Sequence, residues 1–175
     1  MNISILDIEA GNIRSVENFF SKNFEHSTKI IPYKNLDLSK DDLLVIPGVG
    51  NFGFVGNKFH ENDTFEKLKR FNNSGKLIIG ICLGAQFLTS GSEEAPNVSG
   101  LGFIKGKCKS LLKHPEYKGR VPRVGWSALR SSIYERHSFY FVHSFYMDIE
   151  DDNRNTKIEL CSDGVTAMVE QQNLL

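Results

Sequence analysis

KLIIGICLGAQFLTS, residues 76–90, is the stretch that decides the fold. Its apolar run KLIIGI predicts a buried strand, and LGAQFLTS, which follows a turn at Cys82, predicts a helix. Gly80 and Gly84 flank the cysteine and permit a tight turn with close packing. The pattern is that of a nucleophile elbow, G-x-nucleophile-x-G, with cysteine as the nucleophile.

The position of Cys82 gives this pattern a chemical reason. A thiol at a helix N-terminus lies in the field of aligned amide dipoles, so we expect its thiolate to be favoured and its sulfur to be exposed. The alternative is a small buried cysteine that packs the end of a strand. The pattern alone favours neither, because an elbow also needs a base and an oxyanion hole.

Strands and helices alternate around this stretch. We expect strands in NISILDI (2–8), TKIIPY (28–33) and LLVIP (43–47), and helices in IRSVENFFSKNF (13–24) and over 62–73. The alternation predicts an α/β fold with a mainly parallel central sheet and flanking helices.

The sequence pattern changes after Gly91, where strand-like runs joined by turns replace the alternation of strands and helices. These runs are GLGFIKGKCKSLL (100–112), RVPRVGW (120–126), SFYFVHSFYMD (138–148), TKIELCS (156–162) and VTAMVE (165–170). They predict an antiparallel extension on the sheet. The length of 175 residues favours one domain, over 1–175.

Composition limits the classes of partner. The 21 basic and 21 acidic residues cancel, so we expect neither nucleic acid nor a membrane as partner. MNISILDIEA lacks a basic n-region, and no stretch is long and apolar enough to span a bilayer, so we expect a cytoplasmic protein. Cys82, Cys108 and Cys161 are widely spaced, which predicts free thiols and no metal site, and nothing indicates a cofactor.

The glycine loop GVGNFG (48–53) has two further interpretations. It fits the dinucleotide pattern G-x-G-x-x-G, but it follows the third strand, and no acidic residue ends a strand about 20 positions later. It can instead present free backbone N–H groups to an oxyanion beside the elbow, or it is an ordinary glycine turn.

KHPEYKG (113–119) contains a His-Pro-Glu tripeptide, which is one way to complete a Cys–His–Glu triad. It lies in a basic, non-aromatic run before the YFVHSFY strand. We therefore expect a solvent-exposed turn at Pro115, without a catalytic role for His114.

The combined motifs closely resemble those of class I glutamine amidotransferases, and specifically the glutaminase subunit of imidazole glycerol phosphate synthase. The motifs, in order, are DIEAGN (7–12), IPGVGNFG (46–53), GICLGAQFL (80–88), SEEAPNVSGLGFI (92–104), VPRVGW (121–126) and YFVHSFY (140–146). The resemblance covers essentially the whole chain. It implies a Cys–His–Glu glutaminase that passes ammonia to a cyclase partner in a heterodimer.

The resemblance also implies roles for individual residues. Cys82 is the expected nucleophile, and the backbone N–H groups of Leu83 and of the loop near Val49 and Gly50 receive the oxyanion. Five residues are expected to hold glutamine: Gln86, Glu94, His143, Ser144 and Phe145. Four residues are expected to face the cyclase: Asn12, Arg123, Trp126 and Tyr140.

Some of these residues have simpler interpretations, and some depart from the family pattern. Glu94 can be a solvated charge in a turn, while Trp126 and His143 can be core residues. Arg123 stands where the family commonly has histidine, Phe145 where tyrosine is frequent, and DIEAGN lacks the usual Tyr-Gly after its aspartate. These departures bear on the choice of partner more than on the chemistry.

The family's triad His and Glu lie in a GVQFHPEKS-like stretch after the segment matched by VTAMVE. The chain reads QQNLL there, so we expect an incomplete C-terminal end and doubtful turnover by these 175 residues. The chain would then be a truncated glutaminase or a degenerate binding subunit. The motifs also allow a paralogue that supplies ammonia for surface-polysaccharide sugars, and the elbow by itself allows a different cysteine hydrolase or peptidase.

Overall fold

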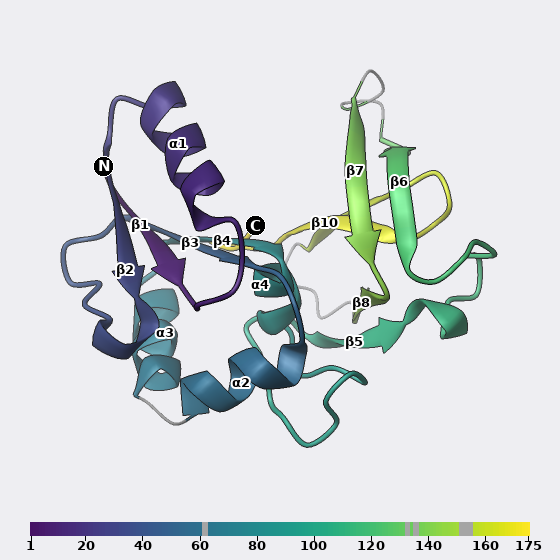
Figure 1. Cartoon of the computed structure of the whole chain (residues 1–175), viewed down its shortest axis with the longest axis horizontal. Coiled ribbons are helices and arrows are strands. Elements are labelled where there is room, and N and C mark those ends of the chain that lie inside the picture. Colours follow the sequence, from purple (N-terminus) through teal and green to yellow (C-terminus); the bar gives the residue numbers. More distant parts are fainter. Residues whose placement is uncertain (61–62, 132–133, 135–136, 151–155) are drawn as a thin grey trace.

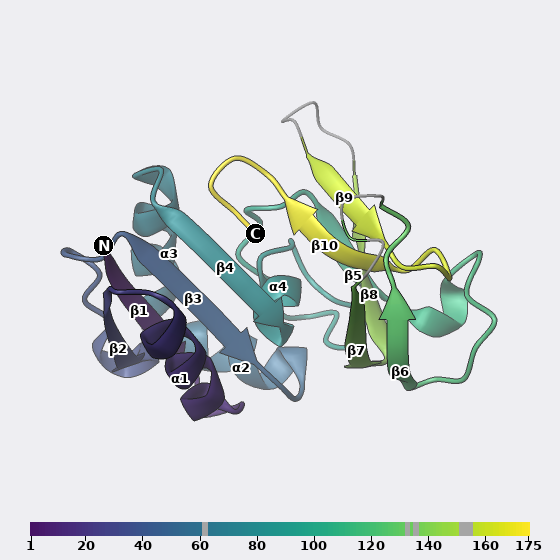
Figure 2. The same cartoon turned by 90° about the horizontal axis from the view of Figure 1, so that it is seen from above.

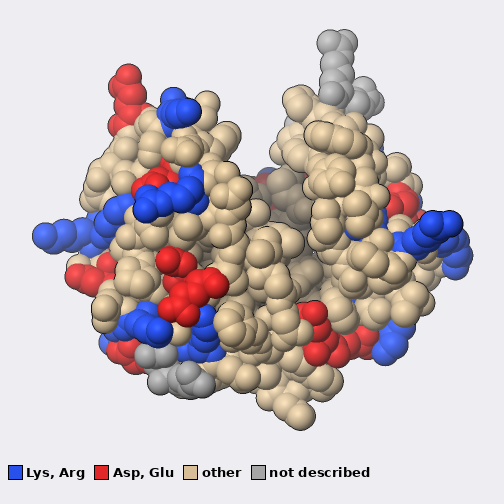
Figure 3. Space-filling view, in the orientation of Figure 1, with Lys and Arg blue, Asp and Glu red and all other residues tan. Residues whose placement is uncertain are grey.

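The computed structural model describes residues 1–60, 63–131, 134, 137–150 and 156–175. It has two halves, an N-terminal α/β half and a C-terminal half of antiparallel strand pairs (Figure 1). The space-filling view shows a hollow between them (Figure 3). No helix in these described ranges is long and apolar enough to cross a membrane.

A parallel sheet of four strands forms the N-terminal half, in the order β2-β1-β3-β4. The strands are β1 (Asn2–Asp7), β2 (Ser27–Pro32), β3 (Leu43–Gly48) and β4 (Leu77–Cys82). Each was predicted from its apolar run. Every residue of β3 is buried, as expected for a central strand covered on both faces.

Helices cover both faces of this sheet, as Figure 2 shows. The helices are α1 (Ile13–Asn23), α2 (Phe52–His60), α3 (Thr64–Asn73) and α4 (Leu83–Phe87), with a short 3₁₀ turn η1 (Tyr33–Asn35). Packing against α1 buries Ile3, Ile5 and Val45 on one face, whereas Leu44, Ile46 and Ile78 belong to the larger core on the other. The helix expected over 62–73 is present from Thr64; position 62 lies outside the described residues.

Helix α2 was not predicted, because its glycines suggested a loop. Gly53 and Gly56 lie in this helix where it packs on the segment around Val98. A Cβ on Gly56 would come within 2.1 Å of Val98 Cγ1, so the glycine serves close packing here and does not break the helix.

The C-terminal half consists of three antiparallel strand pairs. The strands are β5 (Gly106–Ser110), β6 (Arg123–Ala128), β7 (Ser138–His143), β8 (Phe145–Ile149), β9 (Lys157–Leu160) and β10 (Thr166–Glu170), with a 3₁₀ turn η2 (Leu111–Lys113). The pairs are β5 with β8, β6 with β7, and β9 with β10. The expected antiparallel pairing is therefore confirmed.

The expected position of these strands as an extension of the central sheet was wrong. In the part of the chain that the structure describes, the pairs form separate two-stranded sheets. The run 138–148 divides at Ser144, so that β7 and β8 pair with different strands. The run 100–112 is a strand only from Gly106, because its first residues bond to α4: the amides of Leu101 and Ile104 donate to Phe87 and Leu88 carbonyls at 2.8 and 3.0 Å.

Residues 173–175 return to the central sheet along the outer edge of β4. Leu174 bridges Ile78 in parallel, and the Ile78 amide donates to the Asn173 carbonyl at 2.9 Å. The Gly80 amide donates to the Leu175 carbonyl at 2.7 Å. This short end pairs because the edge of β4 offers unpaired backbone N–H and C=O groups.

Candidate active site

Cys82 occupies a strained backbone position at the junction of β4 and α4. Its φ angle is +56°, a region that residues other than glycine rarely adopt and that costs about 1–3 kcal/mol. Its register partner across the sheet is Gly48, the last residue of β3. This sharp strand-to-helix turn, with an exposed cysteine at its apex, is the geometry predicted for the elbow.

The two glycines of the motif are sterically required. A Cβ on Gly84 would lie 1.7 Å from the carbonyl oxygen of Ile46 in β3. One on Gly80 would lie 2.6 Å from the Cα of Ala85. These close approaches press α4 onto β3 and β4 and thereby fix where Cys82 points.

The expectation that the helix terminus favours the Cys82 thiolate was wrong. Although Cys82 is exposed as a residue, neighbouring atoms partly bury its sulfur and raise the pKa of the thiol, and the backbone N–H of Leu83 offsets this only in part. Helix α4 has five residues, so few aligned peptide dipoles act on the sulfur. Burial raises the pKa of the Cys108 thiol further, to about 12.

The loop after β3 forms the wall next to Cys82. Val49 and Gly50 are exposed there, and Gly50 has φ +108°. The loop is anchored where α2 begins: the Phe52 amide donates to Glu94 Oε2 at 2.7 Å, and the Phe52 ring packs against Phe87 with centroids 5.0 Å apart. Half-buried Glu94 therefore caps α2, and it does not lie as a free charge in its turn.

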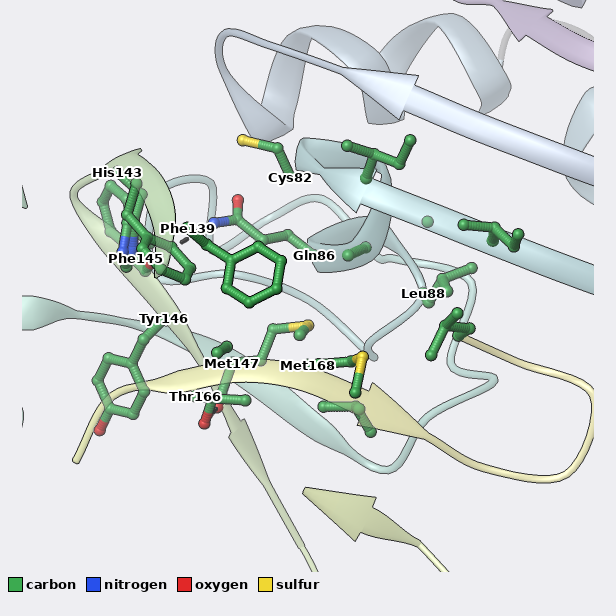
Figure 4. A pocket seen from close by; sticks show the side chains of 18 of the residues that line it. Cys82, Gln86, Leu88, Phe139, His143, Phe145, Tyr146, Met147, Thr166 and Met168 are labelled. Atoms are coloured by element: carbon green, nitrogen blue, oxygen red, sulfur yellow. Dashed lines mark hydrogen bonds between the residues drawn. The ribbon is translucent and has the colours of Figure 1, made fainter. Parts of the chain in front are cut away.

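The opposite wall comes from the β7–β8 junction. Gln86, on α4, donates from Nε2 to the Phe145 carbonyl at 3.2 Å, an interaction drawn in Figure 4. The same carbonyl lies 2.8 Å from His143 Nδ1. On the other side of the ring, His143 Nε2 lies 3.3 Å from an Arg123 nitrogen. The half-buried imidazole thus has a partner on each nitrogen.

All nine residues expected to bind or activate glutamine line one cavity of about 460 Å³. They are Val49, Gly50, Cys82, Leu83, Gln86, Glu94, His143, Ser144 and Phe145. A second, mostly apolar cavity of about 430 Å³ adjoins it and runs from Cys82 between β4 and the strands β7, β8 and β10 to Leu175 (Figure 4).

The KHPEYKG segment makes a local turn away from both cavities. His114 Nδ1 accepts from the backbone amides of Glu116 and Tyr117 at 3.2 and 3.0 Å. The Glu116 carboxylate is bound to Arg130 at 2.8 Å, so it does not orient the imidazole. Neither His114 nor Glu116 lines either cavity, so the predicted turn is confirmed.

The four residues expected at a partner interface divide into three environments. Trp126 and Tyr140 lie on the β6–β7 pair, 73% and 55% exposed, with rings packed edge to face at 5.5 Å. Asn12 is exposed and accepts from the Ser15 amide at the start of α1. Arg123 is 6% exposed and turned inward. Its carboxylate partner, Asp163, was not predicted, since a lone aspartate in a turn carries no sequence signal.

Comparison with known proteins was consistent with this geometry. A family model, Glutamine amidotransferase class-I, matches residues 4–174. The imidazole glycerol phosphate synthase subunit HisH of Trichormus variabilis is 33% identical, over 99% of this chain and 84% of that protein. The HisH subunit of Thermus thermophilus is 34% identical, over 100% of this chain and 86% of that protein.

Two solved structures have the same fold at low sequence identity. A crystal structure described as a glutamine amidotransferase superposes with a TM-score of 0.74 at 17% identity, covering 98% of this chain and 86% of that one. The PurLQS structure from Thermotoga maritima gives a TM-score of 0.71 at 17% identity, covering 99% and 84%.

Proposed function

This chain belongs to the class I glutamine amidotransferase family, and from that premise we propose that it is the glutaminase subunit of an imidazole glycerol phosphate synthase. It would hydrolyse glutamine to glutamate and ammonia for histidine biosynthesis. The observation that carries the proposal is that one of the two cavities beside Cys82 is lined by all nine residues expected to act on glutamine.

In the proposed reaction the Cys82 thiolate attacks the side-chain amide carbon of glutamine. A carbon–sulfur bond forms, and the carbonyl electrons move to the oxygen. The backbone N–H of Leu83 and those of the Val49–Gly50 loop would donate to this oxyanion. Its collapse breaks the carbon–nitrogen bond, ammonia leaves with a proton, and water then cleaves the γ-glutamyl thioester to glutamate and free thiol.

A general base must move the protons in both steps, and His143 is badly placed for that role. It is the only histidine that lines the Cys82 cavity among the described residues, and both of its nitrogens are engaged elsewhere. The edge of β4 is a better position. In the register that pairs Leu174 with Ile78, a strand that continued past Leu175 would run toward Cys82. We propose that in a longer form of the chain the base and its carboxylate partner come from such a segment.

The proposed partner is the cyclase subunit that receives the ammonia. The support for this is the HisH name of the relatives and the exposed aromatic pair on β6–β7, since exposed aromatic rings are common anchors of interfaces. Trp126→Ala should weaken binding of a cyclase subunit by about 2 kcal/mol, roughly thirtyfold in Kd. Unchanged binding would remove Trp126 from the interface.

The glutaminase proposal is tested by labelling with an electrophile that mimics glutamine. We expect one label per chain, at Cys82, and protection by free glutamine. The buried Cys108 and Cys161 serve as internal controls that should stay unlabelled. Cys82→Ser should abolish labelling. Labelling that glutamine does not slow would count against a glutamine site and favour a different cysteine hydrolase.

A further inference from the structure

Arg123 is a buried cation at the start of β6, behind the wall of the Cys82 cavity. Its side chain is 7% exposed, and its Nε donates to Asp163 Oδ2 at 2.8 Å. Its guanidinium carbon lies 4.5 Å from the centroid of the Phe141 ring. A guanidinium this far from water needs such partners, because an unpaired buried charge is strongly destabilising.

The contacts of His143 fix its protonation state. The Phe145 carbonyl can only accept a hydrogen bond, so Nδ1 must carry the proton. Arginine can only donate, so Nε2, which faces Arg123, must be bare. An imidazolium would place an N–H against the guanidinium N–H groups. The neutral Nδ1–H tautomer is therefore the state that satisfies both contacts.

The same contacts connect Arg123 to the helix of the nucleophile. The Phe145 carbonyl is shared by His143 Nδ1–H and by the side-chain amide of Gln86, which lies one turn after Cys82. A continuous series of hydrogen bonds thus runs from Asp163 through Arg123, His143 and Phe145 to Gln86. It joins the β9–β10 turn to α4 across the hollow between the two halves of the molecule.

We propose that Arg123 is a positioning residue that holds His143 as the neutral Nδ1–H imidazole and so fixes the 143–145 segment and Gln86 around the bound substrate. Arg123 does not touch the cavity; it acts through His143. Its effect on glutamine rests on the proposed function, whereas its effect on the imidazole does not.

The charged and titratable groups around His143 support the neutral form. Burial lowers the pKa of His143, the bond to the Phe145 carbonyl raises it, and the charge of Arg123 lowers it while that of Asp163 raises it. The other titratable residues that line the cavity are Cys82, Tyr140 and Glu94. Replacing Arg123 removes a nearby cation and leaves Asp163 beside the imidazole. Both changes favour the imidazolium, so the pKa of His143 should rise.

Nitrogen NMR of the histidine rings tests the assignment without any turnover. In the unmodified chain we expect the His143 ring to have a protonated Nδ1 and a bare Nε2. The signals of this ring are identified as those missing from the spectrum of His143→Gln. They should not titrate at the ordinary histidine pKa. In Arg123→Met the ring should protonate at a higher pH than in the unmodified chain. An Nε2–H tautomer, or the same titration in both proteins, would overturn the proposal.

If Arg123→Met does not fold, variants that keep more of the contacts among Asp163, Arg123 and His143 provide the test. Arg123→Lys keeps the charge, but it has one ammonium where the guanidinium fork bridges Asp163 and His143, so the Nδ1–H state should be partly lost. Asp163→Asn removes the carboxylate that raises the pKa of His143 while Arg123 remains, so the ring should not protonate at a higher pH in that variant. The control is Lys157→Met, which breaks the exposed ion pair between Lys157 and Glu170 on β9 and β10, the strands joined by the Asp163 turn. It should leave the tautomer and the pKa of His143 unchanged.

The glutamine arm measures how well glutamine protects Cys82 from the electrophile. Arg123→Lys should raise the glutamine concentration needed for half protection by about tenfold, the effect of losing one charge-assisted hydrogen bond. Alkylation of Cys82 by a small electrophile that does not mimic glutamine should stay within about twofold, because Arg123 does not line the cavity. Normal protection in a folded Arg123→Lys chain whose His143 has changed tautomer would overturn the positioning role. If glutamine gives no protection even in the unmodified chain, the proposed function fails, and the NMR result still decides the protonation state.

Discussion

Gly84→Ala should both destabilise the fold and displace the nucleophile. The new Cβ would lie 1.7 Å from the Ile46 carbonyl oxygen and 2.7 Å from its carbon. Both atoms belong to the backbone of a fully buried strand, so no side-chain rotation relieves the contact. Helix α4 would have to move away from β3 by more than about 1 Å. Overpacking of this kind typically lowers the free energy of unfolding by about 1–3 kcal/mol.

We expect a loss near the upper end of that range, about 3 kcal/mol, because the obstacle is backbone. For a chain of this size that corresponds to a fall in Tm of about 6–12 °C. A displacement of about 1 Å at the reacting atoms can reduce rates about a hundredfold, so labelling of Cys82 by the glutamine-mimicking electrophile should fall by about that factor.

Gly75→Ala is the matched control for this change. Gly75 ends the turn between α3 and β4, and a Cβ there would meet nothing within 4 Å, but its φ of +74° makes the alanine strained. We expect a cost of about 1 kcal/mol with unchanged labelling of Cys82. Thermal and urea unfolding measure the first effect and mass spectrometry the second. A Gly84→Ala protein within about 1 kcal/mol of the parent, with normal labelling, would refute the steric account of the elbow.

Three further predictions concern single side chains. The rate of Cys82 alkylation should rise about tenfold per pH unit from pH 7 to pH 9, because the raised pKa of the thiol keeps it mostly protonated over this range. A plateau of the rate near pH 7 would contradict this. Glu94→Ala should lower the free energy of unfolding by about 1 kcal/mol and slow labelling, because α2 loses its cap beside the oxyanion loop, whereas unchanged unfolding in urea would refute the capping role. His114→Ala should change labelling and any glutaminase rate by less than about twofold, and a large loss would return the KHPEYKG histidine to the active site.

The central sheet and the elbow could be predicted because local patterns determine them. Each parallel strand contains a short apolar run, and the alternation of strands and helices leaves little choice of fold. The elbow is encoded in five adjacent residues, and its geometry depends on the absence of a Cβ at Gly80 and Gly84. Within the N-terminal half, a local pattern was misleading for α2, where glycine allows close packing against Val98 and does not mark a turn.

The C-terminal half was harder to predict because its pairings depend on contacts between distant residues. The run 138–148 looks like one strand, yet the change of direction at Ser144 gives β7 and β8 different partners. The last residues pair with β4 at a separation of about a hundred positions, through Asn173, whose side chain also donates to the Lys76 carbonyl at 2.7 Å. No periodicity in the sequence reports such a pairing.

The candidate site also has one side set by a local sequence pattern and one side set by contacts between distant residues. Backbone geometry creates the nucleophile side: a strained Cys82 and glycines without room for a side chain, supported by the packed core beneath α4. Side-chain partners hold the opposite wall, where we propose that the substrate binds; among them are Arg123 and Asp163, which are 40 residues apart. A motif therefore predicts the proposed nucleophile, while the residues that orient the opposite wall are found only in the structure. It follows that a change at position 123 can alter the His143 side of the cavity, where we propose that glutamine binds, while the elbow motif stays intact.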